Sequence, residues 1–177
     1  MFDSDDRRVH RMLSQRVYVA LLAGVLLWCL AIVAAPLLHG GRWTGVSAFL
    51  YAFFHPICNQ IDSHSFHIAG EKTGVCMRCT SIYFSFFAGL LVYPLFRSIT
   101  SRVGAGRSWL LAAVVPMVVD VALSLLNVHE SSSVTRVFTG AFFGIIAVFV
   151  LLPIIIDASS ELMTRTRVQP SPTNTKD

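Results

Sequence analysis

Charged side chains are scarce in this chain. Only 14% of the 177 residues are charged, whereas 54% are hydrophobic; soluble domains average about 25% charged and about 45–50% apolar residues. The apolar excess lies in long uncharged blocks, which predicts a polytopic membrane protein surrounded by the lipid bilayer. The net charge is +4, but no basic helix or aromatic-interleaved basic patch occurs, so we expect no nucleic-acid partner.

Basic residues are also missing from the extreme N-terminus, where a secretory signal peptide would carry them. Residues 2–6 read FDSDD, and the first apolar block is longer than the core of a signal peptide. We therefore expect this block to be retained as a first span.

Four apolar segments approach the length that a bilayer requires, which is about 20 residues. These segments are residues 17–38, 80–96, 109–126 and 134–156. Each is expected to be helical, because lipid cannot satisfy backbone polar groups. A fifth run, residues 46–57, is short and aromatic-rich, and it predicts an interfacial or re-entrant helix. The expected fold is an all-α, four-helix transmembrane bundle.

Lysines and arginines predict the orientation of these spans, because they are enriched in cytoplasmic loops. Ten of the 14 would lie on one side of the membrane: Arg7, Arg8, Arg11, Arg16, Arg97, Arg102, Arg107, Arg165, Arg167 and Lys176. The other side would hold Arg42, Lys72, Arg78 and Arg136. We therefore predict a multi-pass protein of the inner cell membrane with both termini in the cytoplasm.

This topology divides the chain into three parts. Residues 1–16 form a cytoplasmic segment, residues 17–157 form the membrane domain, and residues 158–177 form a polar cytoplasmic tail that we expect to be disordered. Within the membrane domain, residues 39–79 form an exoplasmic loop. Small residues at four-residue spacing predict sites of close helix packing: Ala20 and Gly24; Ser81, Ser85 and Gly89; Gly140 and Gly144.

Cysteine is nearly absent outside the exoplasmic loop and the start of the second span. Cys29 lies in the first span without polar neighbours in sequence, and we expect it to be a buried apolar residue. The remaining cysteines follow the pattern H-x-x-C, seventeen residues, C-x-x-C, formed by His55, Cys58, Cys76 and Cys79. Two further histidines, His64 and His67, lie within the gap.

Pairs of Cys or His separated by two residues, with a loop between the pairs, are typical of zinc sites. The spacing predicts a site formed by Cys58, Cys76, Cys79 and His55, with His64 or His67 as replacements for His55. Four protein ligands would make a closed structural site, and three would leave a position for water. Such a metal would also hold a loop of this length over the bundle.

Two alternatives remain open for the same cysteines. Cys76 and Cys79 begin a helix, whose N-terminus favours a thiolate, and exoplasmic compartments are oxidising. The arrangement resembles the quinone-coupled disulfide oxidoreductases of the bacterial periplasm, although residues 127–136 contain no second cysteine pair. Cys58 would then have to be the partner thiol. The other alternative is a structural disulfide between Cys58 and Cys76 or Cys79.

The stretch from residue 55 to residue 91 also resembles an uncharacterised family of small prokaryotic membrane proteins, catalogued as Domain of Unknown Function 2085. The positions that match its pattern are Cys58, Gln60, Ser65, Phe66, Cys76, Arg78, Cys79, Thr80, Tyr83, Asp120, Arg136, Thr139 and Gly140. Asn59 and Ser81 depart from it, because the family has His and Gly there. The resemblance implies a four-span protein with an exoplasmic site, and it implies no activity.

Asp120 is the acidic residue inside the expected spans. A charge there costs about 2.5–3.5 kcal/mol on insertion scales, so such residues are functional candidates. Ser124 and Asn127 share its helical face, and Arg136 and Thr139 enter the next span from the same side. We expect an Asp120–Arg136 ion pair beneath the cysteine loop.

These observations lead to a first hypothesis, a membrane protein that binds zinc at its outer surface. A quinone-coupled thiol–disulfide oxidoreductase is the second hypothesis, and a small transporter or an accessory subunit of a membrane complex is the third. A transporter would need a homo-oligomer, because four spans leave little room for a pathway, and an accessory subunit would need a membrane-complex partner.

Overall fold

The computed structural model describes residues 3–99, 107–126 and 132–168, which are mostly helical. The elements are α1 (Asp3–Leu37), α2 (Thr44–Phe54), a 3-10 helix (Asp62–His64), β1 (His67–Ile68), β2 (Glu71–Lys72), α3 (Met77–Phe96), α4 (Arg107–Leu125) and α5 (Ser133–Val168). The two short strands pair antiparallel, with His67 opposite Lys72 and Ile68 opposite Glu71. Apart from this hairpin, the expected helical class is confirmed for the described residues.

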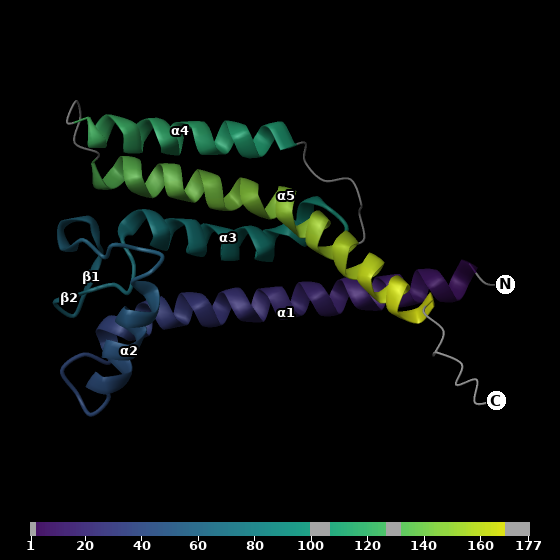
Figure 1. Cartoon of the computed structure of the whole chain (residues 1–177), viewed down its shortest axis with the longest axis horizontal. Coiled ribbons are helices and arrows are strands. Elements are labelled where there is room, and N and C mark those ends of the chain that lie inside the picture. Colours follow the sequence, from purple (N-terminus) through teal and green to yellow (C-terminus); the bar gives the residue numbers. More distant parts are fainter. Residues whose placement is uncertain (1–2, 100–106, 127–131, 169–177) are drawn as a thin grey trace, which may run out of the picture.

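The helices α1, α3, α4 and α5 lie side by side along the long axis of the molecule (Figure 1). Helix α5 packs against both α3 and α4, and α1 packs against α3. The start of α1 and the end of α5 lie together at one end, which we call the terminal end. Helix α2, the hairpin and the start of α3 lie at the other end, which we call the cysteine end. The expected loop therefore forms an ordered cap over one end of the bundle.

Among the described residues, three helices are long and apolar enough to cross a membrane: Arg11–Leu37, Met77–Phe96 and Ser133–Glu161. They correspond to the first, second and fourth expected spans. The described apolar stretch of α4, Leu111–Ser124, is shorter than a span. Helix α4 lies where the expected third span should be, and its crossing of the membrane remains a prediction.

Two helices extend well beyond the expected spans. Helix α1 begins at Asp3, so most of segment 1–16 is helical, and α5 continues to Val168 through much of the expected tail. Neither extension contains Gly or Pro, so nothing in the sequence stops the helix where the apolar pattern ends. Pro170 follows soon after α5, and residues 169–177 lie outside the described part.

The packing site between α3 and α5 consists of the small residues expected there. A Cβ on Gly140 would lie 2.6 Å from the carbonyl oxygen of Arg78, and one on Gly144 would overlap Ser85. Gly89 likewise faces Val148 at 3.0 Å. The predicted packing of these glycines is confirmed. The prediction for α1 is wrong, because Ala20 is exposed and a Cβ on Gly24 would meet nothing within 4 Å.

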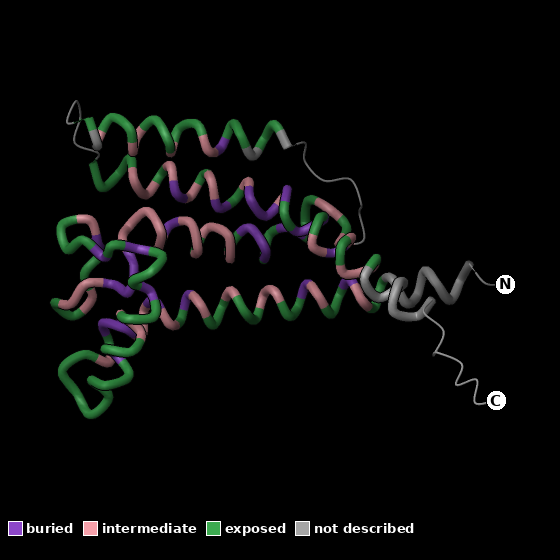
Figure 2. The backbone as a smooth tube through the Cα atoms, viewed as in Figure 1, coloured by how far each residue is buried: buried purple, intermediate pink, exposed green. Residues whose placement is uncertain are grey.

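Buried residues follow α3, α5 and the cysteine end, whereas α4 is largely exposed (Figure 2). One apolar cluster joins α1, α3 and α5 through Tyr18, Leu90, Tyr93, Val148, Leu152 and Ile156. A second cluster lies at the cysteine end and contains Ile32, Phe54, Cys58 and Val75. Cys29 is buried, as expected. The outward faces of the helices are apolar, as in helices that contact lipid.

Helix α2 confirms the short helix expected from residues 46–57, and it turns away from the axis of α1 (Figure 1). Its Phe54 is fully buried against Trp28, whose ring centroid lies 5.3 Å away. Phe49 and Phe53 on the same helix are exposed. One side of α2 therefore belongs to the core of the cysteine end, and the other presents aromatic rings outward.

Candidate functional site

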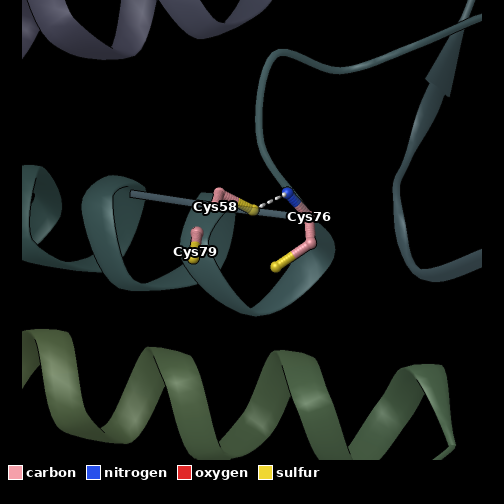
Figure 3. A group of neighbouring side chains, drawn as sticks. All are labelled: Cys58, Cys76 and Cys79. Carbon is pink, nitrogen blue, oxygen red and sulfur yellow. Dashed lines mark hydrogen bonds between the residues drawn. The ribbon is translucent and has the colours of Figure 1, made fainter. Parts of the chain in front are cut away.

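Cys58, Cys76 and Cys79 come together at the start of α3 (Figure 3). Their sulfur atoms all lie within 4.8 Å of one another. Cys76 is the residue before the first turn of α3, and Cys79 lies in that turn. Cys58 comes from the turn after α2, so the intervening segment folds back as the sequence predicted.

Cys58 is the most buried of these cysteines. The backbone N–H of Cys76 donates a hydrogen bond to its Sγ, at 3.2 Å. The pKa of Cys58 is lowered because the thiol groups of Cys76 and Cys79 donate to its sulfur, and the backbone N–H of Cys76 adds to this effect. Burial opposes the shift. The arrangement thus favours a negatively charged sulfur at the centre of the group.

A proline in α1 explains where the loop docks. In an α-helix, residue 36 would donate its N–H to the carbonyl of Ile32, but Pro36 has no N–H. The backbone N–H of Gly74 donates to that carbonyl instead, at 3.2 Å. Nearby, the hydroxyl of Ser47 on α2 donates to the carbonyl of Ala35, at 2.6 Å. The end of α1 is therefore the surface that positions both α2 and the segment leading to Cys76.

Gln60 joins the two sides of the folded-back segment. Its backbone has a positive φ of 50°, and its buried side-chain amide donates to the carbonyls of Tyr51 and Gly74, each at 2.8 Å. The ammonium group of Lys72 donates to the carbonyl of Gln60, at 2.9 Å. These bonds hold the residues after Cys58 against those before Cys76. The loop thus has a network of hydrogen bonds that orders it in addition to any metal.

Within the described residues, the group that brings metal-ligating atoms together contains the three cysteines and no histidine. His55 is exposed after α2, and His67 is also exposed, with its Nε2 3.3 Å from Oδ1 of Asp62. His64 ends the 3-10 helix and is half-buried. The structure therefore assembles the expected cysteines, and it does not place a histidine among them.

Asp120 forms an ion pair with Arg78, between Oδ2 and Nη2. We expected Arg136 to be its partner, and the structure corrects this assignment. Arg78 lies between Cys76 and Cys79, so its side chain leaves the first turn of α3 on a different face from the cysteines and reaches α4. Both side chains are largely buried, with 20% of Arg78 and 11% of Asp120 exposed.

The other polar residues expected near Asp120 have separate surroundings. The Oγ atom of Ser124 and the Nε atom of Arg78 are both buried, and neither has a hydrogen-bond partner among the described residues. Thr139 donates to the carbonyl of Thr135 within α5, at 2.8 Å. Asn127 lies outside the described residues. The ion pair thus joins the CxxC turn to α4.

Three aromatic side chains, Trp28, Phe54 and Tyr83, pack beside the cysteines. Trp28 packs against Phe54 and against Tyr83, whose ring centroid lies 5.6 Å away. Its indole Nε1 is buried without a hydrogen-bond partner among the described residues. Sequence reasoning missed Trp28, Pro36 and Gly74. A proline inside an apolar helix was the available signal, because it leaves one carbonyl without its usual donor.

Several positions that carry the family resemblance support the cysteine group. Gln60 bridges the loop, Arg78 pairs with Asp120, and Gly140 approaches the carbonyl of Arg78. The hydroxyl of Thr80 donates to the carbonyl of Val75, at 3.3 Å. The pattern thus includes residues that hold the first turn of α3 in place as well as the cysteines themselves.

Comparisons with known proteins agree with the family resemblance. A family model described as a predicted membrane protein (DUF2085) matches residues 58–150. An uncharacterised protein of Methanocaldococcus jannaschii is 32% identical over 145 residues, which is 79% of this chain and 93% of the relative. No solved structure matches the chain. The matched region runs from Cys58 through the CxxC turn and Asp120 into α5, and the chain belongs to this DUF2085 family of predicted membrane proteins.

Proposed function

We propose that the chain is a zinc-binding membrane protein whose metal is held by the thiolates of Cys58, Cys76 and Cys79. The carrying observation is the convergence of the three sulfur atoms within 4.8 Å. Zinc–thiolate bonds of about 2.3 Å in a tetrahedron put sulfur atoms about 3.8 Å apart. The spacing of these sulfur atoms is therefore compatible with one shared ion.

The donor set fits a soft or borderline cation. Thiolates select zinc, copper(I) and iron–sulfur centres over magnesium or calcium. Three protein ligands leave one position of a zinc tetrahedron for water or another molecule. Cys76 and Cys79 are only half-buried, which is compatible with access to that position. This feature favours an open site over a purely structural one.

The zinc proposal is tested by measuring bound metal and reactive thiols in the full chain purified in mild detergent. We expect about one zinc per chain, with the three cysteines reacting only after a chelator is added. Cys58→Ser, Cys76→Ser and Cys79→Ser should each lose the metal. Cys29→Ser is the matched control, because Cys29 is buried and is not one of the three grouped cysteines. Full metal content in all three site variants would refute the proposal.

A thiol–disulfide oxidoreductase is the second candidate. It is favoured by the hydrogen bond from Cys76 N–H to Cys58 Sγ, which holds a third thiol beside the CxxC pair. In this reaction Cys76 and Cys79 form a disulfide and release two electrons and two protons, which reduce a quinone to a quinol. A dithiothreitol-sensitive Cys76–Cys79 bond in metal-free protein would favour it over zinc binding.

We further propose that α4 is the fourth span and that the cysteine end is exoplasmic. An even number of crossings agrees with the start of α1 and the end of α5 lying at the same end (Figure 1). Arg11, Arg16 and Arg97 belong to that terminal end, as the cytoplasmic excess of basic residues predicts. A membrane-impermeant thiol reagent should label metal-free Cys76 and Cys79 in intact spheroplasts. Labelling only after lysis would overturn this orientation.

A further inference from the structure

A second polar site lies at the terminal end, far along the bundle from the cysteines. It is a cavity of about 330 Å³ between the first part of α1 and the end of α3. Its polar lining residues are Arg11, Ser14, Gln15, Arg97 and Ser98. The lining therefore brings together two guanidinium groups, a side-chain amide and two hydroxyls, and no carboxylate occurs among the lining residues whose side chains the structure describes.

The chemistry of this lining fits an anion with several oxygen atoms. Guanidinium groups recognise phosphate oxygens by paired, charge-assisted hydrogen bonds, and hydroxyl and amide groups donate to the remaining oxygens. The two arginines come from helices that are far apart in sequence, so the fold itself creates the site.

The position of the cavity indicates where this anion comes from. Arg97 directly follows a candidate span, Met77–Phe96, and Arg11 lies on α1 shortly before the apolar block of residues 17–38 begins. The cavity thus lies at the level where two spans leave the hydrocarbon. Next to its lining residues in the sequence, Met12, Leu95 and Phe96 expose apolar side chains, with 82% of Leu95 exposed. A phospholipid whose phosphate group lies in this cavity would keep its acyl chains against these residues.

We propose that this cavity binds a phosphate group, and that its source is the head group of an anionic phospholipid in the surrounding leaflet. Basic pockets between transmembrane helices are known sites for such head groups. The site is separate from the cysteine group, and nothing in the zinc proposal depends on it. An inorganic phosphate ion shares the same chemistry and is the other possible source.

The test uses the full chain in nanodiscs of phosphatidylcholine with a minor fraction of phosphatidylglycerol. After transfer to mild detergent, retained lipid is measured by native mass spectrometry. Each arginine near the membrane surface contributes enough for about a fivefold change in binding, so Arg11→Gln should lose about fivefold and R11Q/R97Q about 30-fold. Arg42→Gln is the charge-matched control, because Arg42 is exposed at the cysteine end.

Selective loss of phosphatidylglycerol from the two variants supports the lipid source. Equal retention by the wild type, R42Q and R11Q/R97Q overturns the proposal, provided that all elute as folded protein. Arg11→Gln alone guards against a folding artefact, because Arg11 is exposed and outside the core. In a second arm, lipid-free protein receives phosphate or chloride at equal ionic strength. Phosphate-specific stabilisation that R11Q/R97Q lacks, without lipid retention, assigns the site to free phosphate and overturns the lipid source.

Discussion

Gly74 donates its backbone N–H to the carbonyl of Ile32, the carbonyl that Pro36 leaves without its intrahelical donor. This bond fixes the segment leading to Cys76 on the end of α1. The contact is also close, because a Cβ at Gly74 would lie 3.1 Å from Phe54 and 3.3 Å from the carbonyl oxygen of Ile32. The position of Cys76 relative to Cys58 therefore depends on the absence of a side chain at residue 74.

Gly74→Ala should displace this segment from α1 and weaken both folding and metal retention. Overpacking of a tight site costs about 1–3 kcal/mol, and zinc content should fall with it. The measurement is unfolding in detergent, followed by tryptophan fluorescence, together with metal analysis. Gly45→Ala is the control, because its Cβ would meet nothing within 4 Å. Equal behaviour of the two variants would contradict the docking role of Gly74.

Arg78 and Asp120 should show strong energetic coupling. Removing one partner of a buried ion pair costs about 3–5 kcal/mol, because the other charge is left buried. We expect R78Q and D120N each to destabilise the bundle, and the double variant R78Q/D120N to cost less than the sum of the two. A double-mutant cycle measures this coupling. Arg136→Gln should have the smaller effect, and a reversed order would restore Arg136 as the partner.

Gln60→Asn tests the bridge across the loop. Asparagine keeps an amide and tolerates positive φ, but it is one methylene shorter and should not reach the carbonyls of Tyr51 and Gly74. Unsatisfied buried groups cost about 1–3 kcal/mol, so both stability and zinc affinity should fall. Competition with a chromogenic chelator reports the affinity. Asn59→Ala, at an exposed neighbour, should leave both quantities near the wild-type values.

Gly144→Ala and Gly24→Ala should have opposite effects. Alanine is favoured over glycine in a helix by about 0.5–1 kcal/mol, and G24A should gain this because the site is open. In G144A the methyl group overlaps Ser85 and the carbonyl of Ile82 on α3. Such overpacking costs about 1–3 kcal/mol. Thermal unfolding in detergent compares the two, and stabilisation by both would mean that α3 and α5 do not pack here.

Patterns of single residue types predicted much of this molecule. Long apolar blocks located three helices that meet the criteria for a span, and the spacing of Cys58, Cys76 and Cys79 predicted their convergence. The composition of an apolar block and the C-x-x-C spacing of Cys76 and Cys79 are local signals, whereas Cys58 joins them through the pairing of H-x-x-C with C-x-x-C across the loop. The packing role of the α5 glycines was equally predictable, because close helix packing requires small residues at regular spacing.

The partners across the bundle were not predictable in the same way. Arg78 and Arg136 both lie near the same end, and only the rotation of α3 about its axis determines which one faces Asp120. The absence of a histidine from the described cysteine group has a related reason, because H-x-x-C spacing does not fix the side from which His55 leaves the turn after α2. The lengths of α1 and α5 were also underestimated. The apolar pattern stops at the lipid boundary, whereas the backbone hydrogen bonds of both helices continue beyond it.

The first turn of α3, with the residues leading into it, contacts Cys58 and three other helices. Its sulfur atoms face Cys58, Arg78 reaches α4, the carbonyl of Arg78 meets Gly140 on α5, and Gly74 just before it binds α1. A small rotation of any of these helices would therefore change the sulfur–sulfur distances. Zinc occupancy of the cysteine group would then depend on the packing of the whole bundle. A molecule bound between the helices would change the zinc affinity without touching the cysteines.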